Sequence, residues 1–171
     1  QQRSSAASDV YKRQEERLFA NGKVHTNLNI NDVKESCKHF IDEGVNSVAI
    51  AFMNAYSNKE HELLAKKTLI ENGFKGEISL SSLVSGEYRE YERTTTTIID
   101  AFVKARMSNY LDTLKNSLND IGFKGSFLLT RSGSGSMTFD EASERPFETI
   151  MSGPVAGAEG AGAVSYTHLT L

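Results

Sequence analysis

The sequence predicts an α/β fold in which helices cover a sheet that contains parallel strands. Two short apolar stretches, Val48–Phe52 and Ile78–Leu80, are separated by one segment with helical periodicity. This strand–helix–strand order is typical of two parallel strands joined by a right-handed crossover. The first stretch shows little polar alternation, as expected for a strand that is covered on both faces. We therefore expect the two strands to be parallel neighbours.

The first elements follow from turn and capping signals. Arg17 to Leu28 reads as a hairpin, because Asn21-Gly22 tolerates the positive φ angles of a tight turn. Asn31 or Asp32 is expected to cap a helix that runs to about Glu43 and ends at Gly44. Its predicted apolar face consists of Val33, Cys37, Phe40 and Ile41.

The next elements alternate between strand and helix. Val45–Met53 is expected to form a buried strand, and Ser57 or Asn58 to cap a helix that reaches about Asn72 and ends at Gly73. The residues expected near one face of that helix are Leu63, Leu64, Lys67 and Ile70. A short strand at Ile78–Ser81 follows.

The second half is mostly helical. Ile99–Ile121 carries a sustained helical stripe and ends at Gly122; the stripe consists of Val103, Met107, Tyr110, Leu114, Leu118 and Ile121. Phe127–Thr130 reads as a strand, Ser132–Ser136 as a loop, and Thr138–Glu144 as a short helix that ends before Pro146. Pro154 suits the first turn of a final helix, because its missing N–H would be unpaired there anyway.

Composition narrows the function classes. The formal net charge is −3, and the basic residues are scattered. This argues against nucleic-acid and membrane-surface partners, which need clustered positive charge. The longest strongly apolar run, Val48–Met53, is too short to span a bilayer. Cys37 is the one cysteine, so no internal disulfide can form, and we expect a cytoplasmic location.

The two ends of the chain differ from the rest. Residues 1–14 are polar and lack a sustained period, while residues 164–171 break the small-residue pattern before them. Both resemble translated adaptor sequence, although naturally disordered termini would look similar. We expect residues 15–163 to form the α/β part and both ends to be non-native or disordered, packing on nothing.

Ser152–Gly162 is the first candidate site and is rich in small residues. Ser152 or Gly153 would sit at the helix cap, and a free helix N-terminus can hold an anion. Glycine within a helix costs about 1 kcal/mol relative to alanine, so Gly157 needs a compensating reason. Close helix packing and direct nucleotide contact would both supply one.

Two further motifs are candidates for ligand binding. Arg93 could clamp a phosphate or carboxylate beside the hydroxyl of Thr94, or it could form a surface ion pair with Glu90 or Glu92. The loop at Ser132-Gly133 follows a strand, and such a loop can aim backbone N–H groups at an anion. Its spacing does not match a P-loop.

Other chemistry is poorly supported by the sequence. The four histidines have no metal-ligand spacing, and His61 is expected to be solvated near the start of its helix. Cys37 lies on an apolar stripe, where core packing is the expected role. No G-x-S-x-G elbow is present, so an esterase triad is not indicated. We therefore predict no metal site and leave the catalytic residues unassigned.

Four stretches resemble the hydantoinase/oxoprolinase family, which also includes acetone- and acetophenone-carboxylase subunits. They occur in the family's order: EERLFANGKV, GVNSVAIAFMNAYSNKEHE, SLSSLVSGEYREYERTTTTIIDAF and RPFETIMSGPVAGAEGAGA. The REYERTTTT and SGPVAG segments are the most specific. The resemblance spans residues 15–163 and identifies an internal part of a hydantoinase A-like subunit within a longer parent protein.

The resemblance implies an actin/Hsp70-like, ribonuclease-H-like ATPase fold with a mixed sheet and flanking helices. The implied reaction uses ATP and Mg²⁺ to phosphorylate the carbonyl oxygen of a small cyclic amide, which makes the amide easier to open. A second, B-type hydantoinase subunit or domain is the implied partner. The alternatives are an ATP-dependent carboxylase subunit and a non-catalytic binding domain of the same fold.

The resemblance also places Ser152, Gly153 and Gly157 at a hinge near the nucleotide. Two departures from the family's pattern matter. The chain has Ser132-Gly133-Ser134-Gly135 where relatives tend to have Ser-Asn-Gly-Gly, and neither Gly-Gly-Thr-type phosphate loop is present. We therefore expect this chain alone to be inactive and to bind neither ATP nor Mg²⁺ tightly.

Overall fold

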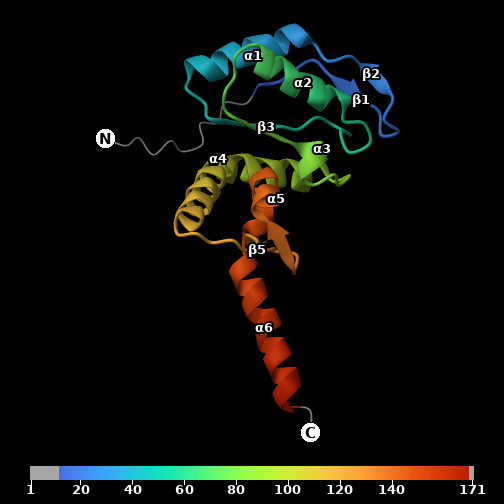
Figure 1. The fold of residues 1–171 in the computed structure, drawn as a ribbon. Helices are drawn as coiled ribbons and strands as arrows, with labels where there is room; N and C mark the ends of the chain where they lie inside the picture. The colour runs from blue at the N-terminus through green and yellow to red at the C-terminus, as the bar shows by residue number, and fades with distance from the viewer. Residues whose placement is uncertain (1–11, 170–171) are drawn as a thin grey trace. The chain divides into compact units, whose positions relative to one another are not determined.

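The computed structural model describes residues 12–169, with side chains up to residue 166. The chain divides into two compact units, the first ending at Phe102 and the second beginning at Val103. Helix α4, Glu90–Asp120, contributes residues to both units. Each unit is described by itself below (Figure 1).

The first unit contains a hairpin, a parallel strand pair and helices. In chain order its elements are β1 Arg17–Leu18, β2 Val24–Thr26, α1 Ile30–Asp42, β3 Ser47–Ile50, α2 Glu60–Glu71, β4 Glu77–Leu80, α3 Ser81–Val84 and the first part of α4. Strands β1 and β2 pair antiparallel, which confirms the predicted hairpin. Gly22 has a φ of 78° in its turn, a conformation that glycine adopts without steric cost.

Strands β3 and β4 are parallel neighbours joined by α2, as the sequence predicts. Their register pairs Ser47 with Glu77 and Ile50 with Leu80. Helices α1 and α2 lie over one face of this pair (Figure 1). The core between them is apolar and consists of Leu28, Val33, Cys37, Phe40, Ile50, Ala65, Leu69, Phe74, Ile78 and Leu80.

The opposite face of β4 is polar but buried. Because side chains alternate along a strand, Ser79 points away from the core that holds Ile78 and Leu80. The Ser79 hydroxyl donates to the Asp100 carboxylate of α4 at 2.6 Å, and both residues are buried. The first part of α4 therefore covers this face, so both faces of β4 are covered.

Helix α2 buries a different face from the one the sequence predicts. Its buried residues are His61, Glu62, Ala65, Thr68 and Leu69. The predicted face is wrong, because Leu63, Leu64 and Ile70 are exposed. The apolar spacing predicted the wrong face because this helix buries polar side chains. Those side chains have hydrogen-bond partners inside the first unit, so their burial leaves few polar atoms unsatisfied.

The second unit contains the end of α4, a short hairpin and two helices. Its elements are β5 Leu128–Thr130, β6 Ser136–Thr138, α5 Phe139–Glu144, a 3₁₀ helix at Pro146–Thr149 and α6 Ser152–Leu169. Strands β5 and β6 pair antiparallel, so the Ser/Gly run is the turn of a hairpin. Its core is formed by Leu111, Met137, Phe139 and Ala142, with Met107, Leu114, Phe127 and Leu129 packed against them.

The expected single mixed sheet is not seen among the described residues, where the strands form three separate two-stranded sheets. Helix α4 begins at Glu90 rather than near Ile99. The predicted stripe along α4 is also only partly correct, because Tyr110 and Ile121 are exposed while Leu111 is buried. The sequence pattern shows which residues are apolar, but not which of them are covered.

The N-caps of α1 and α2 differ from the predicted residues, and the N-cap of α2 is Lys59 rather than Ser57 or Asn58. The cap of α1 is Asn29, two positions before the nearer expected residue, and it accepts from the N–H of Asn31; Gly44 follows the helix with a φ of 66°. Thr138 and Glu141 form a reciprocal capping box at the start of α5. Each cap satisfies backbone groups that the first or last turn of a helix leaves unpaired.

The predicted ends fit the structure only in part. Residues 1–11 and 170–171 lie outside the described residues. Gln14 donates its amide Nε2 to the Ser36 hydroxyl at 3.1 Å, so the prediction that this end packs on nothing is wrong for Gln14. Helix α6 continues past Ala163 to Leu169, without the break expected there. The non-native origin of both ends stays a prediction.

Candidate functional site

The first candidate site lies where β3 and β4 end. The loop from β3 to α2, the short helix α3 and the start of α4 meet at these carboxyl ends. Ligands of open α/β sheets bind outside the carboxyl ends of the strands. We call this region the carboxyl edge and define it by Phe52, Asn54, Tyr56, Glu62, Ser81, Ser82, Glu90 and Arg93.

Arg93 is the centre of the carboxyl edge. Its side chain is fully buried, which is rare for arginine. The guanidinium donates from Nε to the Ser81 hydroxyl at 3.0 Å and from Nη2 to the Phe52 carbonyl at 2.9 Å. It also donates to the Glu87 carbonyl at 2.8 Å and forms an ion pair with Glu90. These bonds join the ends of both strands to the start of α4.

Glu62 supplies a second buried charge at the carboxyl edge. It lies on α2 with no exposed surface. One carboxylate oxygen accepts from the Phe52 N–H at 3.1 Å and from the Ser81 hydroxyl at 2.5 Å. The other accepts from the Ser82 N–H at 2.9 Å. Three donors therefore replace the water that the carboxylate loses on burial.

Asn54 holds the loop after β3 in a left-handed conformation. Its φ is 59°, which is uncommon for a residue other than glycine. The Asn54 N–H donates to Glu90 at 3.0 Å, and its side-chain amide donates to the Leu18 carbonyl at 2.9 Å. The loop is thus fixed from both the hairpin and α4.

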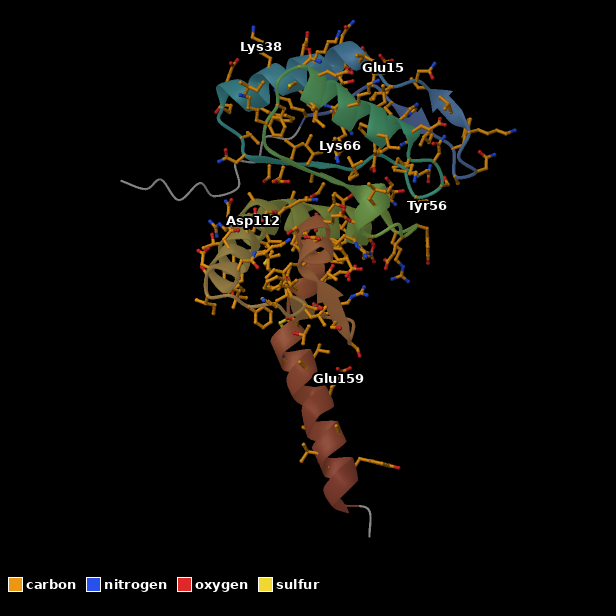
Figure 2. All side chains as sticks on the ribbon, viewed as in Figure 1. Glu15, Lys38, Tyr56, Lys66, Asp112 and Glu159 are labelled. Carbon is orange, nitrogen blue, oxygen red and sulfur yellow. The ribbon has the colours of Figure 1, made fainter. Side chains whose placement is uncertain are left out.

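Two hydroxyl groups at the carboxyl edge have no hydrogen-bond partner among the described residues. The Ser82 Oγ atom is buried and unpaired. Tyr56 is half-buried on the loop that leads from β3 to α2 and is labelled in Figure 2. Its ring faces the Arg93 guanidinium at 5.6 Å, and no bond to its hydroxyl is found.

The structure tests part of what the sequence suggested for the REYERTTTT motif. Arg93 forms the suggested ion pair with Glu90, but the Arg93 side chain is buried rather than at the surface, and its guanidinium is bonded to the protein. The threonines of this motif lie within α4. Thr96 and Thr97 donate their hydroxyls to the carbonyls of Glu92 and Arg93 at 2.8 and 2.7 Å, which makes them compatible with a helix. Thr94 is half-buried beside Arg93.

The expectation for His61 is also wrong. Its ring is buried rather than solvated, and its Nδ1 atom lies 2.9 Å from a carboxylate oxygen of Glu16. Both side chains are more than nine-tenths buried. The pair anchors the residue before β1 to α2, so His61 is used in packing the first unit.

Cys37 is a core residue, as predicted. Its thiol lies 3.5 Å from the Leu69 carbonyl oxygen, in the apolar core between α1 and α2. Burial raises the pKa of the Cys37 thiol, although a backbone hydrogen bond at Phe74 partly opposes this. A raised pKa reduces the thiolate form that a nucleophile would need.

The second candidate site lies in the second unit and brings two predicted motifs together. Ser132 donates its N–H to the Glu148 carbonyl at 2.7 Å, and its hydroxyl contacts the carbonyls of Glu148 and Ile150. Ser134 also contacts Glu159 of α6. The turn that contains Ser132 and Gly133 therefore adjoins the segment leading to Ser152 and Gly153 at the start of α6.

Gly157 does not lie at a close helix crossing in this structure. It is exposed, and a Cβ atom added there would meet nothing within 4 Å. Gly153 and Gly133 are likewise open. Of the two reasons that the sequence offers for a glycine here, close helix packing is thus not seen among the described residues.

The described residues do not fit a Mg²⁺ site. Among the side chains of residues 12–166, no group of three or more His, Cys, Asp and Glu residues is arranged to hold a metal ion. The buried Glu62 carboxylate already accepts hydrogen bonds from the protein. In the same part of the chain, no helix is long and apolar enough to cross a membrane.

Two residues of the hydrogen-bond network at the carboxyl edge had no clear signal in the sequence. Glu62 reads as an ordinary charged residue in the first turn of a helix, and Ser81 as the end of a strand. Ser81 becomes identifiable once β3 and β4 are paired, because residues that follow parallel neighbours share one edge. That deduction, made with Arg93 in view, could have found Ser81 but not Glu62.

Comparison with family models shows where this chain belongs. The model of the hydantoinase/oxoprolinase N-terminal region matches residues 4–73, and that of hydantoinase/oxoprolinase matches residues 93–169. The chain belongs to the hydantoinase/oxoprolinase family. The two matched regions of the chain lie on either side of β4 and α3.

Individual relatives agree with this assignment. An uncharacterized protein of Methanocaldococcus jannaschii is 37% identical over 84% of this chain and 21% of its own length. The acetophenone carboxylase gamma subunit of Aromatoleum aromaticum is 29% identical over 85% of this chain and 20% of that protein. The 5-oxoprolinase of Dictyostelium discoideum is 30% identical over 74% of this chain and 10% of that protein.

Two solved structures share the fold. Nucleotide-free acetone carboxylase superposes with a TM-score of 0.80 and 22% identity, over 90% of this chain and 22% of that chain. The ATP-dependent caprolactamase of Pseudomonas jessenii gives 0.70 and 22%, over 73% of this chain and 18% of that chain. The chain thus spans about a fifth or less of the length of these relatives.

Proposed function

We propose that this chain is part of a parent protein that uses ATP to open a small cyclic amide. The observation that carries the proposal is membership of a family in which a 5-oxoprolinase matches this chain. An ATP-dependent caprolactamase shares its fold. An actin-like ATPase fold, a cytoplasmic location and a B-type partner subunit belong to the same proposal.

The chemistry follows from the poor reactivity of an amide. The amide oxygen attacks the terminal phosphorus of ATP, the P–O bond to ADP breaks, and ADP leaves. Water adds to the activated carbon, and the C–N bond breaks to give an acyl phosphate and a free amine. A second water attacks the acyl carbon and releases phosphate. This sequence consumes one ATP and two waters for each ring opened.

In the proposed function, the carboxyl edge is a rigid structural support. Glu62 and Arg93 hold the loop after β3 and the start of α4 in one arrangement. Arg93 acts indirectly, since its guanidinium is bonded to protein carbonyls, and Thr94 lies next to it. We assign Ser152, Gly153 and Gly157 to a hinge near the nucleotide, and Ser132 and Gly133 to the vicinity of the substrate or phosphate. The Mg²⁺ ligands must come from the rest of the parent protein.

A carboxylase subunit is the second candidate function. It is favoured by the similarity to an acetophenone carboxylase gamma subunit and by the TM-score of 0.80 to acetone carboxylase. In that case ATP would activate a ketone or its co-substrate. Partner subunits would then be required, because the relatives are themselves named as subunits.

The experiment is a phosphate-release assay on the full-length parent protein with Mg²⁺ and ATP. Caprolactam and 5-oxoproline represent cyclic amides, while acetone and acetophenone with bicarbonate represent carboxylase substrates. We expect a cyclic amide to raise phosphate release by at least about tenfold, with the opened amino acid formed in equal amount. Stimulation by a ketone and bicarbonate alone would favour the carboxylase. No stimulation by either class would refute both.

A further inference from the structure

Tyr56 is held at the carboxyl edge while its hydroxyl group remains unused. The ring faces the Arg93 guanidinium at 5.6 Å, and four interactions fix that guanidinium in turn. A cation that lies over a tyrosine ring attracts the ring and restrains the orientation of the ring. Tyr56 is thus positioned through its ring, and its hydroxyl is available to a ligand.

The surroundings of Tyr56 suit a neutral ligand better than a phosphate group. Phosphates are bound by clustered cations or by several free backbone N–H groups. Here the nearby guanidinium is buried, and the Phe52, Asn54 and Ser82 N–H groups already donate to carboxylates. A phenol hydroxyl can both donate and accept a hydrogen bond, which matches the C=O and N–H of an amide.

We infer that the Tyr56 hydroxyl hydrogen-bonds the amide group of the organic substrate, with Arg93 positioning the ring. The inference rests on the proposed function and adds a residue to it. Its location agrees with the general placement of ligands at the carboxyl ends of parallel strands. Tyr56 would therefore contribute to binding and selecting the amide and leave the binding of ATP unaffected.

The test compares Tyr56→Phe with wild type in the full-length parent protein. This substitution removes the hydroxyl and keeps the ring that faces Arg93. Tyr91→Phe is the matched control, because Tyr91 lies two residues before Arg93 but is 80% exposed. Thermal unfolding of all three proteins should agree. The measured quantities are kcat and KM for caprolactam or 5-oxoproline, whichever is turned over, and KM for ATP.

We expect Tyr56→Phe to raise KM for the amide about three- to tenfold, the effect of one lost hydrogen bond. The kcat value and KM for ATP should change less than about twofold, and Tyr91→Phe should match wild type. Unchanged KM for the amide, or an equal change in KM for ATP, would overturn the inference. A defect caused only by folding would lower the unfolding temperature as well.

A binding measurement separates this inference from the proposed function. If the wild-type parent turns over neither amide, the proposed function fails, and binding of both amides is measured by saturation-transfer NMR. Binding to wild type that weakens at least about threefold in Tyr56→Phe would support the role of Tyr56. If wild type binds neither amide, or if the variant binds equally well, the role of Tyr56 is refuted.

Discussion

The Nη2 atom of Arg93 lies 2.9 Å from the carbonyl oxygen of Phe52, although 41 positions separate the two residues in the sequence. This bond ties helix α4 to the end of β3. The same guanidinium reaches Ser81, the residue directly after β4. The structure of the carboxyl edge therefore depends on one buried cation, and the first prediction concerns its removal.

Arg93→Ala should destabilise this chain by about 3–5 kcal/mol, because it removes a buried cation and leaves the half-buried Glu90 carboxylate and the Phe52 and Glu87 carbonyls without their donor. Arg89→Ala is the control. Its side chain is 59% exposed, and its ion pair with Glu92 is of the surface kind, which contributes about 0–1 kcal/mol. Urea unfolding of both variants measures the difference. Equal effects of the two substitutions would show that the buried network does not stabilise the fold.

Glu62→Gln should also destabilise the chain, by about 1–3 kcal/mol. The Glu62 carboxylate accepts from three donors, whereas glutamine would direct an NH₂ group at some of them. Glu60→Gln, in the same helical turn but exposed, should change stability by less than about 0.5 kcal/mol. A Glu62→Gln protein as stable as wild type in denaturant would mean that the network tolerates a neutral group.

Cys37 should resist thiol reagents while the chain is folded. Its thiol is buried, and its raised pKa lowers the thiolate fraction at any given pH below that of a free cysteine. Labelling at about pH 8 should therefore be slow and should accelerate as urea unfolds the chain. The same chain in full denaturant supplies the reference rate. Labelling of the folded chain at that reference rate would place Cys37 at the surface.

Glu141 should make stability depend on pH in acid. The Thr138 backbone N–H and hydroxyl lower the pKa of Glu141 in the folded state. A lowered pKa gives stability that is present above the unfolded pKa and is lost as pH falls through the folded pKa. Wild type should therefore lose its advantage over Glu141→Gln between about pH 6 and about pH 3 in thermal unfolding. A difference that is independent of pH would show that the charge of Glu141 contributes nothing.

Gly157 allows the hinge to be tested separately from the fold of this chain. Because Gly157 is exposed, Gly157→Ala should stabilise helix α6 by up to about 1 kcal/mol. Gly157→Leu should unfold this chain no more easily, yet lower ATP turnover in the parent protein if another helix crosses there. Wild-type turnover in the leucine variant would remove the hinge role assigned to Gly157.

The elements of the first unit were accessible from sequence because each has a local cause. Asn21-Gly22 makes a turn, Gly44 and Gly73 follow helix ends, and the two apolar stretches form parallel strands. The inward face of α2 was not accessible. Its buried members His61 and Glu62 are polar, and their partners come from residues far away in the sequence.

The candidate site was only partly predictable for the same reason. Arg93 was recognised as a notable residue, but its burial depends on Phe52, Ser81 and Glu87 meeting at one edge. Tyr56 carries no motif of its own and is notable because its hydroxyl is unpaired there. In the second unit, some large side chains of α4 and α6, such as that of Tyr166, are exposed in the same way as Leu63.

An isotope-transfer measurement on the parent protein tests the central proposal most directly. A cyclic amide labelled with ¹⁸O at its carbonyl oxygen is turned over with Mg²⁺ and ATP, and the released phosphate is analysed by mass spectrometry. We predict one ¹⁸O atom in each phosphate formed, because the carbonyl oxygen bonds to phosphorus and leaves with it. Unlabelled phosphate accompanying ring opening would contradict activation of the amide through its carbonyl oxygen.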